Sequence, residues 1–347
     1  MLKFRNLKGH RDDQDRRKKG GPGEREEMVD FGESSPELGA DAADSTELAE
    51  RAEHLYQQVC DYSRETFGQV RRNMSFSLDE GSRVVNDIVN ASVDDALFSK
   101  ALHEENGSDF LVTHAANVAI YSIKMGASLG LSKEKQVELG MAGLLHDVGK
   151  CTISEEVLYK QDRLNDEELS MVREASNHGY DLLRSLGKEY AYLAECCLHV
   201  YERTDGSGYP KGLKGDEIHE YAQIIGLVDF YEALTHSRPQ REKFLHFAAV
   251  KEIINSGKSA FQRQHLKALL RIFSIFPLDS YVKLNSNAIG RVTETYLDQP
   301  MRPRLQIISD SQGSPVLTEQ VVNLPEHPLL YIVDSVAEAT LREVASA

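Results

Sequence analysis

Four side chains of the metal-binding kind lie in or beside apolar segments of this sequence. His146 and Asp147 are adjacent at the end of an apolar run, His114 shares a helical stripe with large apolar residues, and Asp229 directly follows the run IIGLV at 224–228. Burying an ionised carboxylate there is costly unless a positive charge pairs with it. Taken singly, these are satisfied core residues; taken together, they predict a shared metal ion. Imidazole and carboxylate suit iron, manganese, zinc or nickel better than calcium.

Helices must position these residues, because apolar side chains recur at helical spacing through most of the chain. Ser132 is a candidate N-cap, and Asn165 with Glu168 resembles a capping box. The helical pattern starts at about Thr46, where Leu48, Ala52, Leu55 and Val59 mark one helix face. The further predicted helical segments are Ser82–Leu102, Phe110–Leu129, Lys133–Leu145, Asp166–Leu186, Ala191–Val200, Tyr221–Leu234 and Phe244–Phe273.

Three other regions lack this helical periodicity of apolar residues. Residues 1–45 are charged and lack apolar periodicity, which predicts a disordered tail. Residues 202–215 hold four glycines and a proline, which predicts a loop. After Pro277, Asn285, Asn287 and Gly313 read as turn residues between predicted strands at Ser280–Leu284, Ile289–Tyr296, Pro303–Ser309 and Glu319–Leu324. The fold class is therefore mainly α with a small C-terminal β attachment.

Composition excludes several classes of function. The formal net charge of −15 opposes binding to nucleic acid polymers or to an anionic membrane. No apolar run is long enough to cross a bilayer, and the basic first 19 residues lack the apolar core of a secretory signal. The four cysteines have no metal-ligand spacing and are expected to be reduced thiols. We therefore predict a cytoplasmic protein without membrane insertion.

Longer motifs resemble one known family. The order of the candidate ligands is similar to the H…HD…D signature of HD-superfamily phosphohydrolases. Residues 202–210 read ERTDGSGYP and resemble the ERxDGxGYP loop of the HD-GYP subfamily. Residues 228–239 resemble that subfamily's VDxYDALTSxRP segment. The resemblance divides the chain into a tail (1–45), an N-terminal helical region (46–105), an HD-GYP core (106–275) and a β-rich extension (276–347).

The resemblance carries expectations about activity. Members of the subfamily have a helical core with a centre of two or three metal ions, often iron or manganese, and their best-known reaction is hydrolysis of cyclic di-GMP. Their loop is implicated in contacts with substrate and with other signalling domains, and a homodimer is a further expectation. Carried onto this sequence, the substrate-binding residues are Arg203, Asp205, Gly208, Tyr209, Pro210 and Arg238.

This sequence departs from the family pattern at the second metal. Three positions at which the family usually has histidine are here Ala175, Val200 and Tyr201. His178 and His199 lie nearby as substitute ligands, although exposed histidines without a metal role are the simpler interpretation. Position 199 is rotated by about 100° from position 200 on a helix, which disfavours its substitution.

One complete ligand set remains, and it predicts one divalent ion per chain, iron or manganese, bound by His114, His146, Asp147 and Asp229. Asp147 and Lys150 are the expected catalytic residues, the latter stabilising charge on a phosphoryl oxygen. The leading hypothesis is a phosphodiesterase acting on cyclic di-GMP with this reduced site. The alternatives are a degenerate signalling module that binds nucleotide or partner domains without hydrolysis, and a one-metal hydrolase of another phosphoester.

Overall fold

The structure is a computed structural model that describes residues 40–91, 94–104, 109–237, 243–257, 259–273, 276, 278–296 and 299–336. The predicted tail, residues 1–45, lies outside these ranges except for 40–45, which open the first helix. The chain divides into two compact units, Met1–Glu47 and Leu48–Ala347. The second unit holds almost everything that is described below.

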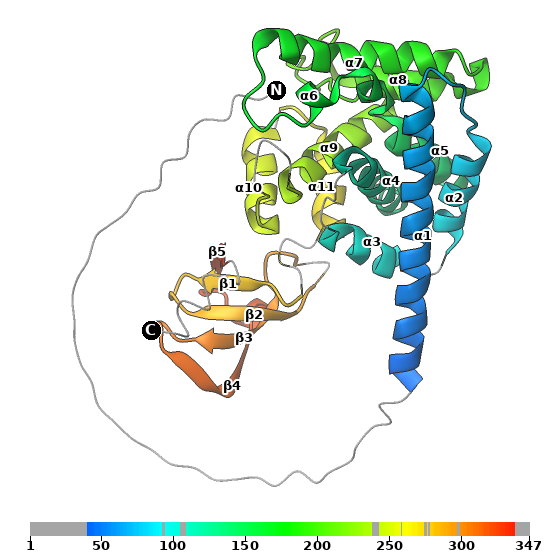
Figure 1. The fold of residues 1–347 in the computed structure, drawn as a ribbon. Helices are drawn as coiled ribbons and strands as arrows, with labels where there is room; N and C mark the ends of the chain where they lie inside the picture. The colour runs from blue at the N-terminus through cyan, green and yellow to red at the C-terminus, as the bar shows by residue number, and fades with distance from the viewer. Residues whose placement is uncertain are drawn as a thin grey trace, which may run out of the picture. The chain divides into compact units, whose positions relative to one another are not determined.

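The described α-helices all precede the strands (Figure 1), and one 3-10 helix, η4 Leu324–Glu326, lies between the last two strands. Their order is α1 Ala40–Arg71, α2 Asp79–Asn90, α3 Asp94–His103, α4 Phe110–Ser128, α5 Lys133–Leu145, η1 Val148–Thr152, α6 Glu155–Leu158, α7 Asp166–Arg184, η2 Lys188–Tyr190, α8 Ala191–His199, η3 Gly215–Glu217, α9 Glu220–Thr235, α10 His246–Gly257 and α11 Arg263–Ile272.

Helices α4 and α9 form the centre of the helical part. Helix α4 contacts α3, α5, α9 and α11, and it is drawn amid these helices in Figure 1. Most residues of α4 and α9 are buried, including polar ones such as His114 and Asp229. A helix that is apolar on nearly every side is stable only inside a core. Polar groups on these two helices are thereby withdrawn from water.

Two predicted helix starts are confirmed. The Ser132 side chain accepts a hydrogen bond from the backbone amide of Lys135 at the start of α5. Asn165 and Glu168 form the reciprocal capping box at the start of α7. Two predicted helices are each divided in the structure: the segment 82–102 into α2 and α3, and the segment 244–273 into α10 and α11. Helix α10 ends at Gly257, which is a poor residue for a helix interior.

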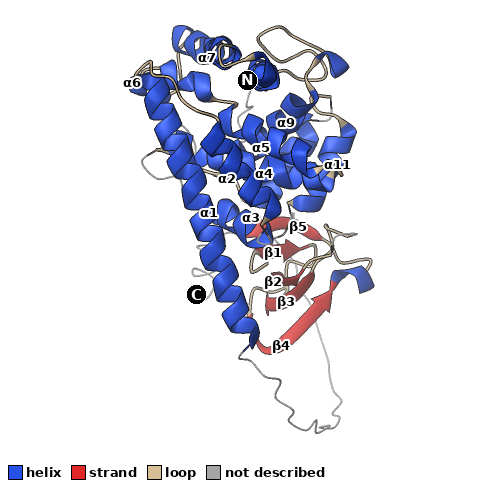
Figure 2. Cartoon of the chain, turned by 90° about the vertical axis from the view of Figure 1, so that its right-hand side faces the viewer, coloured by secondary structure: helices blue, strands red, loops and turns tan. Residues whose placement is uncertain are grey.

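The C-terminal strands form one antiparallel sheet in the order β4-β3-β2-β1-β5 (Figure 2). Their bounds are β1 Tyr281–Leu284, β2 Ile289–Glu294, β3 Arg304–Ser309, β4 Pro315–Asn323 and β5 Ile332–Val336. Alternate residues of β1 and β3 are buried, as expected for strands with one covered face. The predicted turn residues Asn287 and Gly313 both have positive φ. Strand β4 begins earlier than predicted, and β5 was not predicted.

Candidate metal centre

Four side chains from two helices and one helix junction converge on one point. His114 comes from α4, Asp229 from α9, and His146 and Asp147 from the junction between α5 and η1. One ligand atom from each lies within 4.8 Å of the others. All four residues are buried. We call them the metal cluster; the geometry brings together the four residues that the sequence predicts as ligands.

The end of α5 explains how two adjacent residues reach one point. His146 caps α5 and keeps helical backbone angles, whereas Asp147 has φ −109° and ψ 13° and so leaves the helix. The following segment packs closely on α7, since a Cβ added to Gly149 would lie 1.9 Å from the carbonyl oxygen of Ala175. Glycine at 149 therefore allows the backbone approach that sets the position of η1 beside Asp147.

Hydrogen bonds at the far side of each imidazole fix which nitrogen faces the cluster. The Nδ1 of His146 donates to the carbonyl oxygen of Gly143 at 2.6 Å, and the Nδ1 of His114 lies 2.5 Å from Oε2 of Glu232. Each acceptor holds a proton on Nδ1, so each Nε2 can offer a lone pair. This is the arrangement that metal-binding histidines use.

The Nε2 atoms face carboxylate oxygens. For His114, Oδ1 of Asp229 lies 3.1 Å away, and for His146, Oδ2 of Asp147 lies 3.4 Å away. The Nε2 of His146 also lies 3.7 Å from Oδ1 of Asp229. A lone pair opposite an ionised oxygen is repulsive unless a cation or a proton lies between them. The cluster therefore fits a divalent cation with mixed nitrogen and oxygen ligands.

The electrostatics keep both carboxyl groups charged. Burial alone would raise the pKa of Asp147, but the Lys150 ammonium and His146 outweigh burial and hold that pKa well below its usual range. Burial likewise opposes charge on Asp229, and hydrogen bonds with His114 and His146 lower its pKa well below the usual value. Two ionised carboxylates are available as ligands at neutral pH.

We expect the affinity for a divalent ion to depend on pH through His146. Burial lowers the pKa of His146, but the charge of Asp147 and hydrogen bonds with Asp147 and Asp229 overcome it, so that the pKa is raised. A proton on Nε2 competes with the ion. At pH values below this raised pKa, the association constant for the divalent ion should fall about tenfold for each unit that the pH decreases. At pH values above the pKa, the association constant should be constant. Titrations of Mn²⁺ between about pH 5 and 8 check this; an affinity independent of pH would contradict it.

Both oxygens of Asp147 have further partners beside the cluster. The ammonium of Lys150 contacts Oδ2, and the hydroxyl of Tyr201 donates to Oδ1 at 2.7 Å. Lys150 Nζ also donates to the Tyr201 hydroxyl oxygen at 2.8 Å. The Tyr201 ring stacks on Tyr209, with ring centres 5.1 Å apart. Two hydrogen-bond donors and two stacked rings thus lie next to the predicted catalytic carboxylate.

Several predicted substrate-binding residues of the loop make contacts within the chain. Arg203 donates to the carbonyl oxygens of Val200 and Glu202 and lies over the Phe261 ring. Asp205 accepts hydrogen bonds from Ser207 and Ser259. A Cβ on Gly208 would lie 2.4 Å from the Glu202 Cα, so the loop folds back on its own start. Pro210 is exposed, and Arg238 lies outside the described residues.

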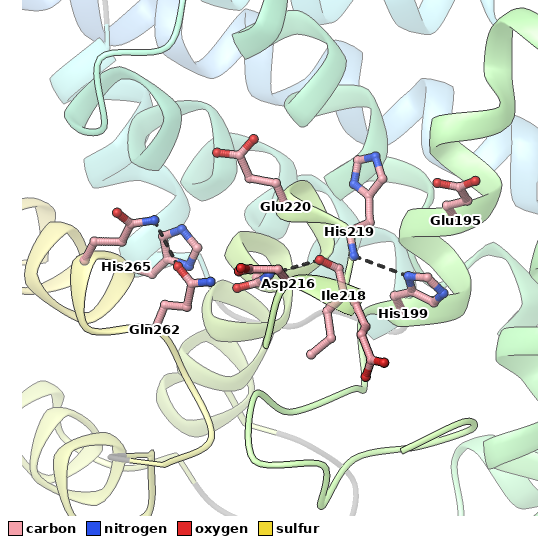
Figure 3. Close-up of a pocket in the computed structure, with 11 residues that line it drawn as sticks. Glu195, His199, Asp216, Ile218, His219, Glu220, Gln262 and His265 are labelled. Atoms are coloured by element: carbon pink, nitrogen blue, oxygen red, sulfur yellow. Dashed lines mark hydrogen bonds between the residues drawn. The ribbon is translucent and has the colours of Figure 1, made fainter. Parts of the chain in front are cut away.

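The histidines that could have replaced missing ligands lie elsewhere. The Nδ1 of His178 is 3.1 Å from the Thr152 hydroxyl, and His178 is exposed. His199 accepts from the backbone amide of His219 and lines a pocket that also includes Glu195 and Glu220 (Figure 3). None of the metal cluster lines that pocket. Ala175 and Val200 are buried and have no side-chain donor atoms.

Two neighbours of the cluster were not predicted. Glu232 holds His114, and the hydroxyl of Tyr201 reaches Asp147. Glu232 lies three residues after Asp229, on the same helix face, and that spacing is a signal from which it could have been found. For Tyr201, the sequence indicates only that a histidine is lacking.

Comparison with known proteins agrees with the geometry. Residues 99–264 match the family described as HD domain, and residues 281–344 match the family described as KOW domain associated with HD domain. A solved structure of Bd1817, described as a HDG"Y"P protein from Bdellovibrio bacteriovorus, superposes with a TM-score of 0.54 at 18% identity, covering 64% of this chain and 71% of that chain. This likeness supports the fold.

Curated relatives are cyclic-dinucleotide phosphodiesterases by name. The cyclic di-GMP phosphodiesterase PA4108 of Pseudomonas aeruginosa is 29% identical over 220 residues, which is 63% of this chain and 53% of that protein. The response regulator RpfG of Xanthomonas campestris is 35% identical over 41% of this chain and 38% of its own length. The 3'3'-cGAMP-specific phosphodiesterase 1 of Vibrio cholerae is 38% identical over 39% of this chain and 31% of that protein. The chain thus spans about half or less of these relatives. Among the described helices, none is both long and apolar enough to cross a bilayer.

Proposed function

This chain belongs to the HD-domain family and carries a domain of the HD-GYP type, and from that membership we propose that it is a metal-dependent phosphodiesterase acting on cyclic di-GMP. The reaction uses one divalent ion, iron or manganese, held by the metal cluster. The observation that carries the proposal is the orientation of the two imidazoles, whose Nε2 atoms face the carboxylate oxygens because Gly143 and Glu232 hold the opposite nitrogens.

The chain's own residues supply the rest of the chemistry. A divalent ion in the cluster would polarise a phosphoryl oxygen and lower the pKa of a water molecule to near 7. Lys150 neutralises Asp147 and places an ammonium where a substrate phosphate would approach. The hydroxyl of Tyr201 donates to the other Asp147 oxygen and accepts from Lys150, so it holds the ammonium in place, and the remaining N–H groups of Lys150 can face the phosphate. Such preorganised donors stabilise charge that develops on a transferring phosphoryl group.

Tyr201 is also the reason for proposing a single ion. Its hydroxyl donates to the Asp147 oxygen that a second ion would need, and Lys150 contacts the other oxygen. Ala175 and Val200 contribute no donor atoms on the same side. A proton donor therefore lies at the Asp147 oxygen where the family resemblance expects a second cation, whereas Lys150 contacts the oxygen that faces the two imidazoles. The remaining positive charge comes from Lys150, so some electrostatic stabilisation is kept.

A second candidate function is a module that binds a cyclic dinucleotide without hydrolysing it. The observation in its favour is that Arg203 and Asp205, two predicted substrate-binding residues, already have partners within the chain. A site without a second ion loses stabilisation of several kcal/mol at the transition state. Slow turnover or none is the consequence that separates the two candidates.

Turnover and binding must be measured on the same preparation. The 347-residue chain, loaded with Mn²⁺ or Fe²⁺ under reducing conditions, is incubated with cyclic di-GMP and, in parallel, with 3'3'-cGAMP. We expect about one ion per chain and slow release of linear dinucleotide or GMP. Binding by calorimetry without product selects the second candidate. Two ions per chain overturn the single-ion site, and the absence of both binding and product overturns both candidates.

A further inference from the structure

Buried polar side chains connect helix α1 to the metal cluster. The hydroxyl of Tyr56, on α1, donates to Oδ1 of Asn117 at 2.8 Å. The amide nitrogen of Asn117 lies 3.5 Å from Oε1 of Glu232, whose Oε2 is 2.5 Å from Nδ1 of His114. Tyr56, Asn117 and Glu232 are 3%, 0% and 1% exposed. We call these three residues the relay, and it ends on a predicted metal ligand.

The chemistry of each group fixes the direction of the relay. Glu232 receives a proton donor, His114 Nδ1, on one oxygen, so the group that faces its other oxygen should also be a donor. Asn117 can present its NH₂ there only while its carbonyl oxygen points the opposite way, toward Tyr56. The hydroxyl of Tyr56 supplies a donor for that oxygen. The amide nitrogen also lies 3.4 Å from Nε2 of His236, so loss of the Tyr56 hydroxyl removes the donor on the amide oxygen and leaves the contacts of the amide nitrogen.

We infer that Tyr56 is a positioning residue for His114 and that α1 thereby controls the affinity of the metal cluster, an inference that rests on the proposed metal-dependent function. The relay holds Glu232, and Glu232 holds the imidazole in the tautomer that offers Nε2 to the ion. Tyr56 precedes the matched HD domain, which begins at residue 99. Helix α1 therefore supplies one of the side chains on which the affinity for the ion depends.

A matched tyrosine on the same helix distinguishes this role from a merely structural one. Tyr62 is 6% exposed, and its hydroxyl donates to the carbonyl oxygen of Ser77 at 3.2 Å. Removing the Tyr56 hydroxyl leaves the buried oxygen of Asn117 with one partner fewer, whereas the acceptor of Tyr62 belongs to the exposed residue Ser77, so only the first change should lower thermal stability clearly. Only the Tyr56 hydroxyl belongs to the relay.

The test compares Tyr56→Phe with Tyr62→Phe by titrating Mn²⁺ against a chelating dye, while thermal unfolding confirms that both variants are folded. We expect Tyr56→Phe to bind Mn²⁺ about tenfold more weakly, at the low end of the loss for a direct outer partner, because Tyr56 acts on His114 through Asn117 and Glu232. Tyr62→Phe should keep wild-type affinity. In an Asn117→Ala background, Tyr56→Phe should add no further loss, since the relay is already broken.

The outcomes separate this inference from the proposed function. If the wild-type protein and Tyr56→Phe bind Mn²⁺ equally well, the relay is overturned and the proposed function is not. The relay is also overturned if Tyr56→Phe and Tyr62→Phe lose equal affinity for Mn²⁺, or if Tyr56→Phe causes its full loss of affinity in the Asn117→Ala background as well. Wild-type protein that binds no Mn²⁺ overturns the proposed function and the relay together.

Discussion

Replacing His146 and Asp147 together by alanine is expected to abolish ion binding and turnover while the helical domain stays folded. Two of the four ligands are lost, and His114 and Asp229 alone cannot enclose an ion. Loss of an outer partner costs about 10- to 100-fold in affinity, so loss of two direct ligands should exceed about 100-fold. Turnover should fall about a thousandfold or more, because an ion contributes several kcal/mol to the transition state.

Elemental analysis after dialysis measures the ion, and circular dichroism confirms the helices. His178→Ala is the matched control, since this exposed imidazole lies beside Thr152 and outside the cluster. It should keep the wild-type ion content. A double variant that retains one tightly bound ion, or loss of the ion in the control, would contradict the assignment of the cluster.

The second large effect is expected from Lys150→Met in metal-free protein. The carboxylate of Asp147 has 2% of its side chain exposed and would lose its ammonium partner. Removing one member of a buried ion pair costs about 3–5 kcal/mol, and the free energy of unfolding should fall by that amount at neutral pH. Added Mn²⁺ should restore part of the loss, because the ion supplies positive charge to the same carboxylate.

The pH dependence of this loss has a definite sign. The pKa of Asp147 is depressed in the folded protein, so its stabilising contribution is present above the unfolded value, about 3.9, and disappears as the pH falls through the folded value. Lys150→Met should therefore matter less at low pH, where Asp147 is neutral in the variant. Chemical denaturation of both proteins at several pH values measures how the difference in the free energy of unfolding depends on pH.

A surface ion pair serves as the control for Lys150→Met. Lys124 contacts Asp95 at 2.6 Å, but the Asp95 side chain is 97% exposed. Lys124→Met should leave stability unchanged, since exposed pairs contribute little. Similar small changes in both variants would show that the Asp147 carboxylate does not depend on Lys150.

Local signals in the sequence predicted much of the fold. The caps at Ser132 and Asn165 depend only on residues within one helical turn, and both are confirmed. The helical segment predicted over 244–273 contains a break after Gly257 that the sequence did not indicate, because apolar residues continue the pattern on both sides of it. Periodicity reports burial, and it does not report where a chain turns between two buried segments.

The cluster could be predicted because a family motif and burial of charge pointed to the same residues. Its outer partners could not, because they are remote in sequence. Glu232 is 118 residues from His114, and Tyr56 is 61 residues from Asn117. The sequence shows Tyr201 as a missing ligand, whereas the structure shows its hydroxyl on the Asp147 oxygen. The residue type at position 201 indicates that no imidazole is available there to bind a metal ion. The contact that the tyrosine makes instead is seen only in the fold.

Anomalous diffraction from crystals of the full chain grown with Mn²⁺ would locate every bound ion directly. The single-ion account predicts one peak among the Nε2 atoms of the two histidines and the oxygens of Asp147 and Asp229, with the Tyr201 hydroxyl still on the other Asp147 oxygen. Two peaks that share Asp147, with Tyr201 displaced, or no peak at these four residues, would contradict it.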